Sequence, residues 1–252
     1  MTKVLYKKNN GVAYITLNRP HKYNAIDRDM NQLLNEIWLD FKKDEDVFVA
    51  IVNGQGDHFC AGFDLGAFMG EIEQSQYEWC KSAMFGKMRS TPNENEVFKP
   101  IITVCKGTVN GMGTLLMLEG DIRITSEQTY IGLGEARLNF PVEFSAFITR
   151  LMPLSIASEM LYTANPINAK RLYDIGIINH IVPENMLMNT AEKIAQDICK
   201  CGCKSIQVMK ELVIKGQYMD YNNAVYLTSI LSVPVVNSEE TKNSIRKSRL
   251  SG

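Results

Sequence analysis

The feature that most constrains the fold is a change of hydrophobic period, repeated along the first part of the chain. Residues 12–20 (VAYITLNRP) and 47–56 (VFVAIVNGQG) are rich in β-branched residues and end in turn-forming residues, as buried strands do. Between them, residues 27–46 place apolar side chains at helical spacing behind Asp27, a favourable N-cap residue. A strand, a helix and a second strand in this order predict an α/β domain.

The same alternation returns later and then gives way to helices. Residues 99–107 (KPIITVCKG) predict another buried strand, and residues 108–125 (TVNGMGTLLMLEGDIRIT) predict a strand, a glycine turn and a helix. From about residue 184 the apolar spacing is helical to the end. We therefore divide the chain into a core, residues 1–195, and a C-terminal helical region, residues 196–252.

The helical region carries too many apolar side chains for a solvated tail. They are Ile206, Met209, Leu212, Val213, Val225, Leu227, Ile230 and Leu231. Apolar helix faces of this extent are buried in folded proteins. We expect them to pack on the core and on neighbouring subunits.

Charge and composition argue against several classes of function. The chain has 27 basic and 28 acidic residues, so it lacks the positive charge that binds nucleic acid or acidic membranes. It has no run of about 18 apolar residues, and its N-terminus predicts a hairpin rather than a signal peptide, so we expect no membrane association and a cytoplasmic location. The spacing of Cys199, Cys201 and Cys203 is not that of zinc sites, so we predict no metal.

Two glycine-bearing turns follow predicted strands and indicate a site built from backbone groups. They are CAGFDL at residues 60–65 and NGMGTLL at residues 110–116. Such turns leave backbone N–H groups without partners in the chain. Two of these groups converging on one oxygen would stabilise an enolate or a tetrahedral oxyanion. The competing interpretation makes Cys60 a nucleophile.

Five segments resemble the crotonase superfamily, the enoyl-CoA hydratase/isomerase family, in order and at similar spacing. They are ITLNRPHKYNAID (15–27), VNGQGDHFCAGFDL (52–65), KPIITVCKGTVNGMG (99–113), EGDIRITSEQTYIGLGEARL (119–138) and AKRLYDIGIINHIV (169–182). The resemblance implies an α/β fold, a crotonase-like spiral of ββα units with a C-terminal helical trimerisation region. It also implies homotrimers, often paired into hexamers.

The resemblance further implies that the substrate is an acyl-CoA thioester, or an acyl-pantetheine on a carrier protein. Coenzyme A would then be part of the substrate, and no separate cofactor is expected. The two oxyanion donors map to the backbone N–H groups of Phe63 and Met112. The positions expected to bind coenzyme A or the acyl group are Lys22, Ala25, Ala61, Asp64, Leu65 and Gly111. Cys60 falls where the family has small residues, so the resemblance implies that its thiol is packed in the core rather than acting as a nucleophile.

The acidic residues decide which reaction is expected. Hydratases of the family carry two glutamates, and these positions map here to Leu115 and Glu135. Hydration needs a water activated and a proton delivered, whereas a double-bond shift needs one base that takes and returns a proton. Leu115 therefore favours an isomerase that uses Glu135. The alternative is a hydratase, dehydratase or dienoyl-CoA isomerase that uses Glu135 with Glu143, and a second alternative is a non-catalytic CoA-binding homologue.

One further acid lies near the predicted site. Glu119 follows Leu115 by four residues and so lies on roughly the same helix face. Arg123 is another four residues on, and we expect an ion pair between Glu119 and Arg123 rather than a displaced catalytic acid.

Overall fold

The computed structural model describes residues 2–67 and 91–250, and a six-stranded sheet lies at its centre. The strand order is β1-β2-β3-β4-β6-β9, with β1 antiparallel to β2 and each later pair parallel. The bounds are β1 Val4–Asn9, β2 Val12–Leu17, β3 Val49–Gly54, β4 Ile101–Cys105, β6 Ile122–Thr125 and β9 His180–Ile181. The predicted hairpin and α/β alternation are confirmed.

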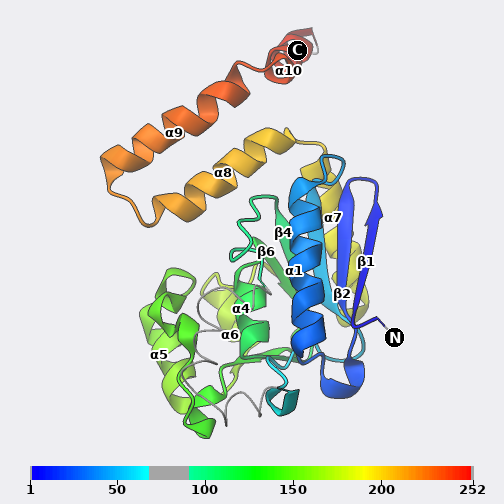
Figure 1. The fold of residues 1–252 in the computed structure, drawn as a ribbon, viewed down its shortest axis with the longest axis vertical. Coiled ribbons are helices and arrows are strands. Elements are labelled where there is room, and N and C mark those ends of the chain that lie inside the picture. Colours follow the sequence, from blue (N-terminus) through cyan, green and yellow to red (C-terminus); the bar gives the residue numbers. More distant parts are fainter. Residues whose placement is uncertain (1, 68–90, 251–252) are drawn as a thin grey trace.

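Helices cover both faces of this sheet (Figure 1). On one face lies α1, Arg28–Lys43, and on the other lies α7, Leu187–Cys199. Asp27 caps α1, because its side chain accepts a hydrogen bond from the Met30 N–H at 3.0 Å. Strands covered on both faces are apolar along their length, which explains the continuous apolar runs of β3 and β4.

A smaller sheet, in the order β5-β7-β8, leads into the site. Its strands are β5 Thr108–Asn110, β7 Tyr130–Gly132 and β8 Ile167–Asn168. β5 runs directly into helix α4, Met112–Leu118, and β7 runs into the 3₁₀ helix η2, Glu135–Leu138. The other elements of the core are η1 Pro20–Lys22, η3 Glu143–Ala146, η4 Ile148–Arg150, α5 Leu154–Thr163, α6 Ala169–Asp174 and η5 Glu184–Met186.

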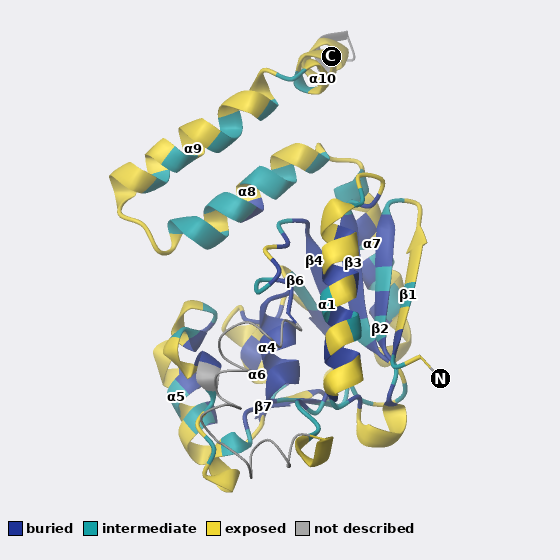
Figure 2. Cartoon of the chain, in the orientation of Figure 1, coloured by how far each residue is buried: buried dark blue, intermediate teal, exposed yellow. Residues whose placement is uncertain are grey.

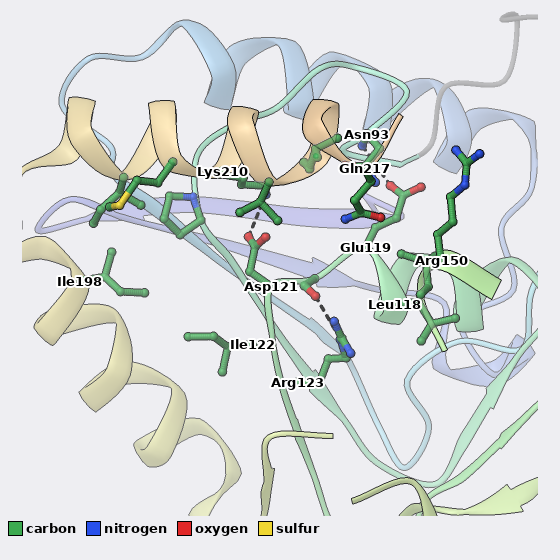
Figure 3. Close-up of a pocket in the computed structure, with 17 residues that line it drawn as sticks. Asn93, Leu118, Glu119, Asp121, Ile122, Arg123, Arg150, Ile198, Lys210 and Gln217 are labelled. Carbon is green, nitrogen blue, oxygen red and sulfur yellow. Dashed lines mark hydrogen bonds and ion pairs between the residues drawn. The ribbon is translucent and has the colours of Figure 1, made fainter. Parts of the chain in front are cut away.

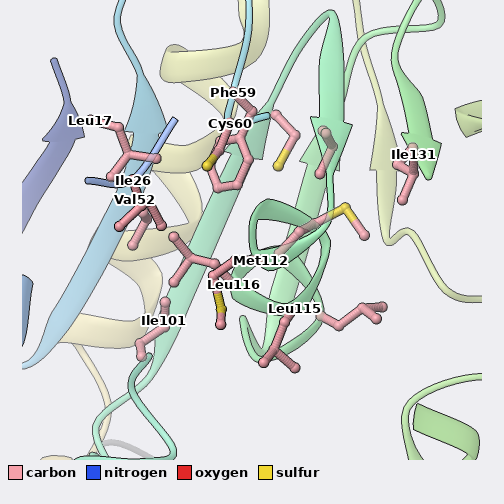
Figure 4. Close-up of a cluster of buried hydrophobic side chains, with 14 of the residues drawn as sticks. Leu17, Ile26, Val52, Phe59, Cys60, Ile101, Met112, Leu115, Leu116 and Ile131 are labelled. Atoms are coloured by element: carbon pink, nitrogen blue, oxygen red, sulfur yellow. The ribbon is translucent and has the colours of Figure 1, made fainter. Parts of the chain in front are cut away.

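The main hydrophobic cluster holds both glycine turns in place. Cys60 and Met112 lie in it with apolar residues of the sheet such as Val52 and Ile101 (Figure 4). The buried apolar residues of α1 belong to the same cluster. All seven residues of α4 are buried. Gly113 packs so closely on the first turn that an added Cβ would lie 2.4 Å from the carbonyl oxygen of Cys60. The N-terminus of α4 is therefore fixed against the Cys60 turn by packing.

The C-terminal helices extend from the core, and the first two of them form a hairpin (Figure 1). They are α8 Cys203–Gly216, α9 Tyr221–Val236 and α10 Glu239–Leu250. Since α7 packs on the sheet as far as Cys199, the change of packing falls at residues 200–202, and the division at 195 cuts through α7. Much of α9 is exposed in the single chain (Figure 2). The exposed fraction is 65% for Val213, 50% for Ile230 and 48% for Val225. The core of the same chain therefore does not cover these side chains.

Candidate active site

The first glycine turn is joined to the second by backbone hydrogen bonds. The Cys60 N–H donates to the carbonyl of Thr108 at 3.3 Å, and the Asn110 N–H donates to the carbonyl of Cys60 at 2.9 Å. Gly62 has a φ of +95°, and an added Cβ would lie 3.0 Å from the carbonyl oxygen of Asn110. Both the conformation and the close approach require glycine.

The two turns bring the N–H groups of Phe63 and Met112 to one region. Ile26 pairs with the atoms on either side of Phe63, the Gly62 carbonyl and the Asp64 N–H, so the Phe63 N–H is directed away from Ile26. The Met112 N–H makes no hydrogen bond within residues 2–67 and 91–250. A Cβ on Gly62 would lie 3.3 Å from the Met112 nitrogen, which places the two turns side by side.

Glu135 lies against the second turn. An added Cβ on Gly111, whose φ is +54°, would lie 2.5 Å from Oε1 of Glu135. Oε2 of Glu135 is buried without a hydrogen-bond partner among the described residues. Burial raises the pKa of this carboxyl above its ordinary value, and its own backbone N–H offsets part of the rise. A desolvated carboxyl of this kind is suited to taking and returning a proton.

These groups share a cavity of about 260 Å³. Its lining residues are Ala61, Gly62, Phe63, Leu65, Asn110, Met112, Gly134, Glu135, Arg137, Leu138, Phe140, Val142 and Phe144. Five residues selected from the sequence therefore line one cavity, and Gly111 lies against its acid. Glu135 is the one carboxylate among the lining residues that the structure describes. A mostly apolar cavity with a few polar groups is typical of a small-molecule site.

Lys22 and Ala25, two of the residues expected to bind coenzyme A, lie outside the lining of this cavity. Lys22 is exposed on η1, and Ala25 is half-buried on the loop that follows. The loop reaches the first turn through the Ala61 N–H, which donates to the carbonyl of Tyr23 at 3.0 Å. The carboxylate of Asp64 is occupied by Arg19 at 2.9 Å, so it supports the turn next to Phe63.

Glu143 is the first residue of η3, and its side chain lies outside the described part of the structure. Its neighbours Val142 and Phe144 line the cavity. Leu115 lies on α4, one turn after Met112, and is 4% exposed. The thiol of Cys60 is fully buried, and burial raises its pKa to about 12, which leaves it protonated and without nucleophilic character at neutral pH.

A second polar lining residue, Asn110, was not selected from the sequence. It ends β5 immediately before Gly111, and its Oδ1 accepts a hydrogen bond from the Gly134 N–H at 3.2 Å. A polar residue at the end of a buried strand, directly before a glycine turn, is a signal that could have identified it. The phenylalanines and tyrosines between residues 63 and 98 are further sequence-based candidates for lining an acyl pocket, and residues 68–90 of this segment lie outside the described part of the chain.

A larger cavity, of about 560 Å³, lies between α8 and the core (Figure 3), and its described lining does not include Glu135. Glu119 and Arg123 both line this cavity, and the ion pair predicted between them is wrong. Glu119 instead accepts a hydrogen bond from the Asn93 N–H at 2.9 Å, and Arg123 donates to the carbonyls of Gly120 and Ile177. Glu119 caps the C-terminus of α4, and its side chain is buried there rather than directed to Arg123 on β6.

Replacing Glu119 by Gln is expected to change how stability depends on pH. Burial raises the pKa of Glu119 from 4.5 to about 7, and the hydrogen bond from Asn93 opposes part of the rise. The folded state then binds more protons than the unfolded state between these values, so stability falls as pH rises through this window. We expect Glu119→Gln to remove about 2 kcal/mol of this loss, measured by urea unfolding from pH 5 to pH 8 at constant protein concentration. Parallel stability curves for the two proteins would contradict the prediction.

Within the described residues, no helix is both long and apolar enough to span a membrane.

The comparisons with known proteins agree on one family. A family model described as enoyl-CoA hydratase/isomerase matches residues 7–248. The short-chain-enoyl-CoA hydratase of Clostridium acetobutylicum is 26% identical over 250 residues, covering 97% of this chain and 94% of that protein. The carnitinyl-CoA dehydratase of Salmonella paratyphi A is 31% identical over 219 residues, covering 84% and 80%.

The fold is shared with solved structures. The crystal structure of an enoyl-CoA hydratase from Bacillus anthracis matches with a TM-score of 0.90 at 24% identity, covering 99% of this chain and 97% of that one. A structure of an enoyl-CoA hydratase/isomerase from Mycobacterium paratuberculosis matches with a TM-score of 0.87, also at 24% identity, covering 97% and 94%.

Proposed function

The chain belongs to the enoyl-CoA hydratase/isomerase family, with the crotonase-like fold that its motifs predicted, and from this premise we propose that it shifts a double bond in an enoyl thioester. The substrate is an acyl-CoA, or an acyl-pantetheine on a carrier protein. The N–H groups of Phe63 and Met112 hold the thioester oxygen, and Glu135 is the base. We assign Lys22, on η1, and Ala25, on the loop after it, to contacts with the coenzyme A moiety.

The observation that carries this proposal is the arrangement of one desolvated carboxylate beside two backbone donors. Glu135 has a buried oxygen without a partner in the part of the chain that the structure describes, and it shares its cavity with Phe63 and Met112. A Leu at position 115 leaves α4 without the acid that a two-glutamate hydratase needs there. A buried acid with no structural partner is costly to keep, which argues against the non-catalytic alternative.

The reaction then needs no group other than these. Two N–H donors stabilise the negative charge that develops on the thioester oxygen when the substrate loses a proton from Cα. Glu135 takes that proton, the double bond moves towards the thioester, and Glu135 returns the proton to Cγ. Atoms and charge balance, because one carboxylate acts first as base and then as acid. The apolar lining of the cavity shelters the dienolate from water.

The test is a turnover assay on 3-hexenoyl-CoA and crotonyl-CoA. A double-bond shift converts 3-hexenoyl-CoA to the conjugated 2-enoyl thioester without a change of mass. Hydration of crotonyl-CoA instead adds one water to the mass. Conjugation without addition of water supports the isomerase. Addition of water to crotonyl-CoA at comparable or greater rate contradicts it.

Hydration or dehydration with Glu135 and Glu143 is the second candidate. The observation in its favour is that the two relatives described above are named as a hydratase and a dehydratase. Glu143 begins η3 between two residues that line the cavity. A carboxylate at that position would supply the second acid that α4 lacks.

We further propose that the functional unit is a trimer or a hexamer. In the single chain, α8 and α9 expose Met209, Val213, Val225 and Ile230, an apolar surface that is costly to leave in water. Light scattering at micromolar concentration is expected to give three or six times the 28.4 kDa mass of one chain. A mass of one chain would contradict the proposal.

A further inference from the structure

Asn110 links the two parts of the proposed site. It stands two residues before Met112, the second donor, and its Oδ1 accepts the N–H of Gly134, the residue before Glu135. That hydrogen bond fixes which end of the carboxamide faces Gly134, because only an oxygen can accept from an N–H. The NH₂ group, Nδ2, is therefore the other end.

Nδ2 of Asn110 has no hydrogen-bond partner among the described residues. It is also not one of the fully buried side-chain atoms that lack a partner there, so it is not fully buried. Since Asn110 lines the cavity, a ligand can reach this group. The same cavity holds the unpartnered Oε2 of Glu135. The other charged lining residue, Arg137, is exposed and donates to Asn165 at 2.7 Å.

Among the described residues, Nδ2 of Asn110 and Oε2 of Glu135 both lack partners in a mostly apolar cavity, and together they complement one kind of group. A hydroxyl oxygen can accept a hydrogen bond from Nδ2 of Asn110 and donate one to Glu135. We propose that Asn110 is a specificity-determining residue. Its side chain binds an oxygen atom of the acyl group, next to the carbons between which Glu135 transfers a proton. The inference rests on the proposed thioester binding, and it holds for isomerisation and hydration alike.

The expected size of the selectivity follows from the cost of an unpaired donor. A purely hydrocarbon acyl group displaces water from Nδ2 and leaves it unpaired, whereas an oxygen-bearing group restores the hydrogen bond. Sites that hydrogen-bond a substrate hydroxyl discriminate strongly against the analogue that lacks it. For one neutral hydrogen bond we expect about a 10-fold to 100-fold preference.

The test compares the binding of three saturated thioesters, one without a hydroxyl group and two with one. Calorimetry gives the dissociation constants of butyryl-CoA and of each enantiomer of 3-hydroxybutyryl-CoA for the parent protein, Asn110→Leu, Asn110→Ser and Leu138→Ala. Asn110→Leu keeps the approximate shape and removes both polar ends. Asn110→Ser keeps a short polar side chain that cannot extend as far into the cavity. Leu138→Ala is the matched control, because it changes the same cavity without changing a polar group.

We expect the parent and Leu138→Ala to prefer one hydroxylated ligand by about 10-fold to 100-fold, and both Asn110 variants to lose at least about 10-fold of that preference. A merely structural role would weaken the binding of butyryl-CoA and of the preferred hydroxylated ligand equally and leave the ratio of their dissociation constants unchanged. A ratio within about twofold of the parent in a folded Asn110 variant overturns the inference. Failure of the parent to bind either thioester would instead contradict the proposed function.

Discussion

Glu135→Gln is expected to lower turnover by about 10² to 10⁴-fold while acyl-CoA binding persists. Gln keeps the shape of the side chain beside Gly111 but cannot take a proton. The two backbone donors are unchanged, so the thioester is still held. Steady-state kinetics with 3-hexenoyl-CoA measure the loss, and calorimetry with butyryl-CoA measures the binding that remains.

The pH profile of the parent provides a second measure of the same group. A general base acts when it is deprotonated, so kcat/KM is expected to rise with pH through the pKa of Glu135. Because burial raises that pKa, the rise is expected above the ordinary range of a glutamate. The pH profile of the residual activity of Glu135→Gln is expected to lack this rise.

Glu143→Gln is the control that separates the two candidate reactions. A one-base isomerase is expected to lose little activity in this variant, whereas a two-acid enzyme is expected to lose nearly as much as with Glu135→Gln. If Glu135→Gln keeps full activity on every accepted thioester, the base is another residue and the proposed mechanism is wrong.

Met112→Pro is expected to lower turnover by about 10² to 10³-fold, because proline removes one of the two proposed oxyanion donors. The position tolerates the change unusually well for a helix. Met112 is the first residue of α4, where proline is favoured and where the N–H has no partner in the described helix. Gly111 before it has φ 54° and ψ −124°, an extended conformation that glycine can adopt before proline.

Met112→Ala is the matched variant, since it removes the side chain and keeps the N–H. We expect it to retain turnover within about tenfold of the parent, so the ratio of the two variants isolates the backbone donor. Circular dichroism verifies that both variants keep the helical content. Equal activity of the alanine and proline variants would exclude the Met112 N–H as an oxyanion donor.

Local residue patterns were enough to predict the layers of the fold. The β-branched runs became β2, β3 and β4, and the helical spacing after Asp27 became α1 with that residue as its cap. These patterns are reliable because a strand covered on both faces, or a helix covered on one, imposes its period on the sequence wherever it occurs. The glycines at 62 and 111 were informative for a similar reason, since each has a positive φ and a close neighbour.

Side-chain partners could not be predicted in this way, because they depend on segments distant in sequence. Glu119 and Arg123 have helical spacing, but α4 ends at Leu118, so the acid meets the Asn93 N–H and the arginine meets the carbonyl of Ile177. Asp64 was selected as a binding residue, and the fold pairs it with Arg19.

The sequence by itself therefore determined the α/β class, the two glycine turns and the identity of the acid at position 135. Only the tertiary structure decided that Glu135 lies against Gly111 and that its Oε2 has no partner among the described residues. It also decided that Asn110, just before α4, accepts a hydrogen bond from Gly134, the residue before Glu135. The physical reason is that backbone conformation is encoded by neighbouring residues, whereas burial and unpaired hydrogen-bonding groups arise only when β5, β7 and the Cys60 turn are packed together.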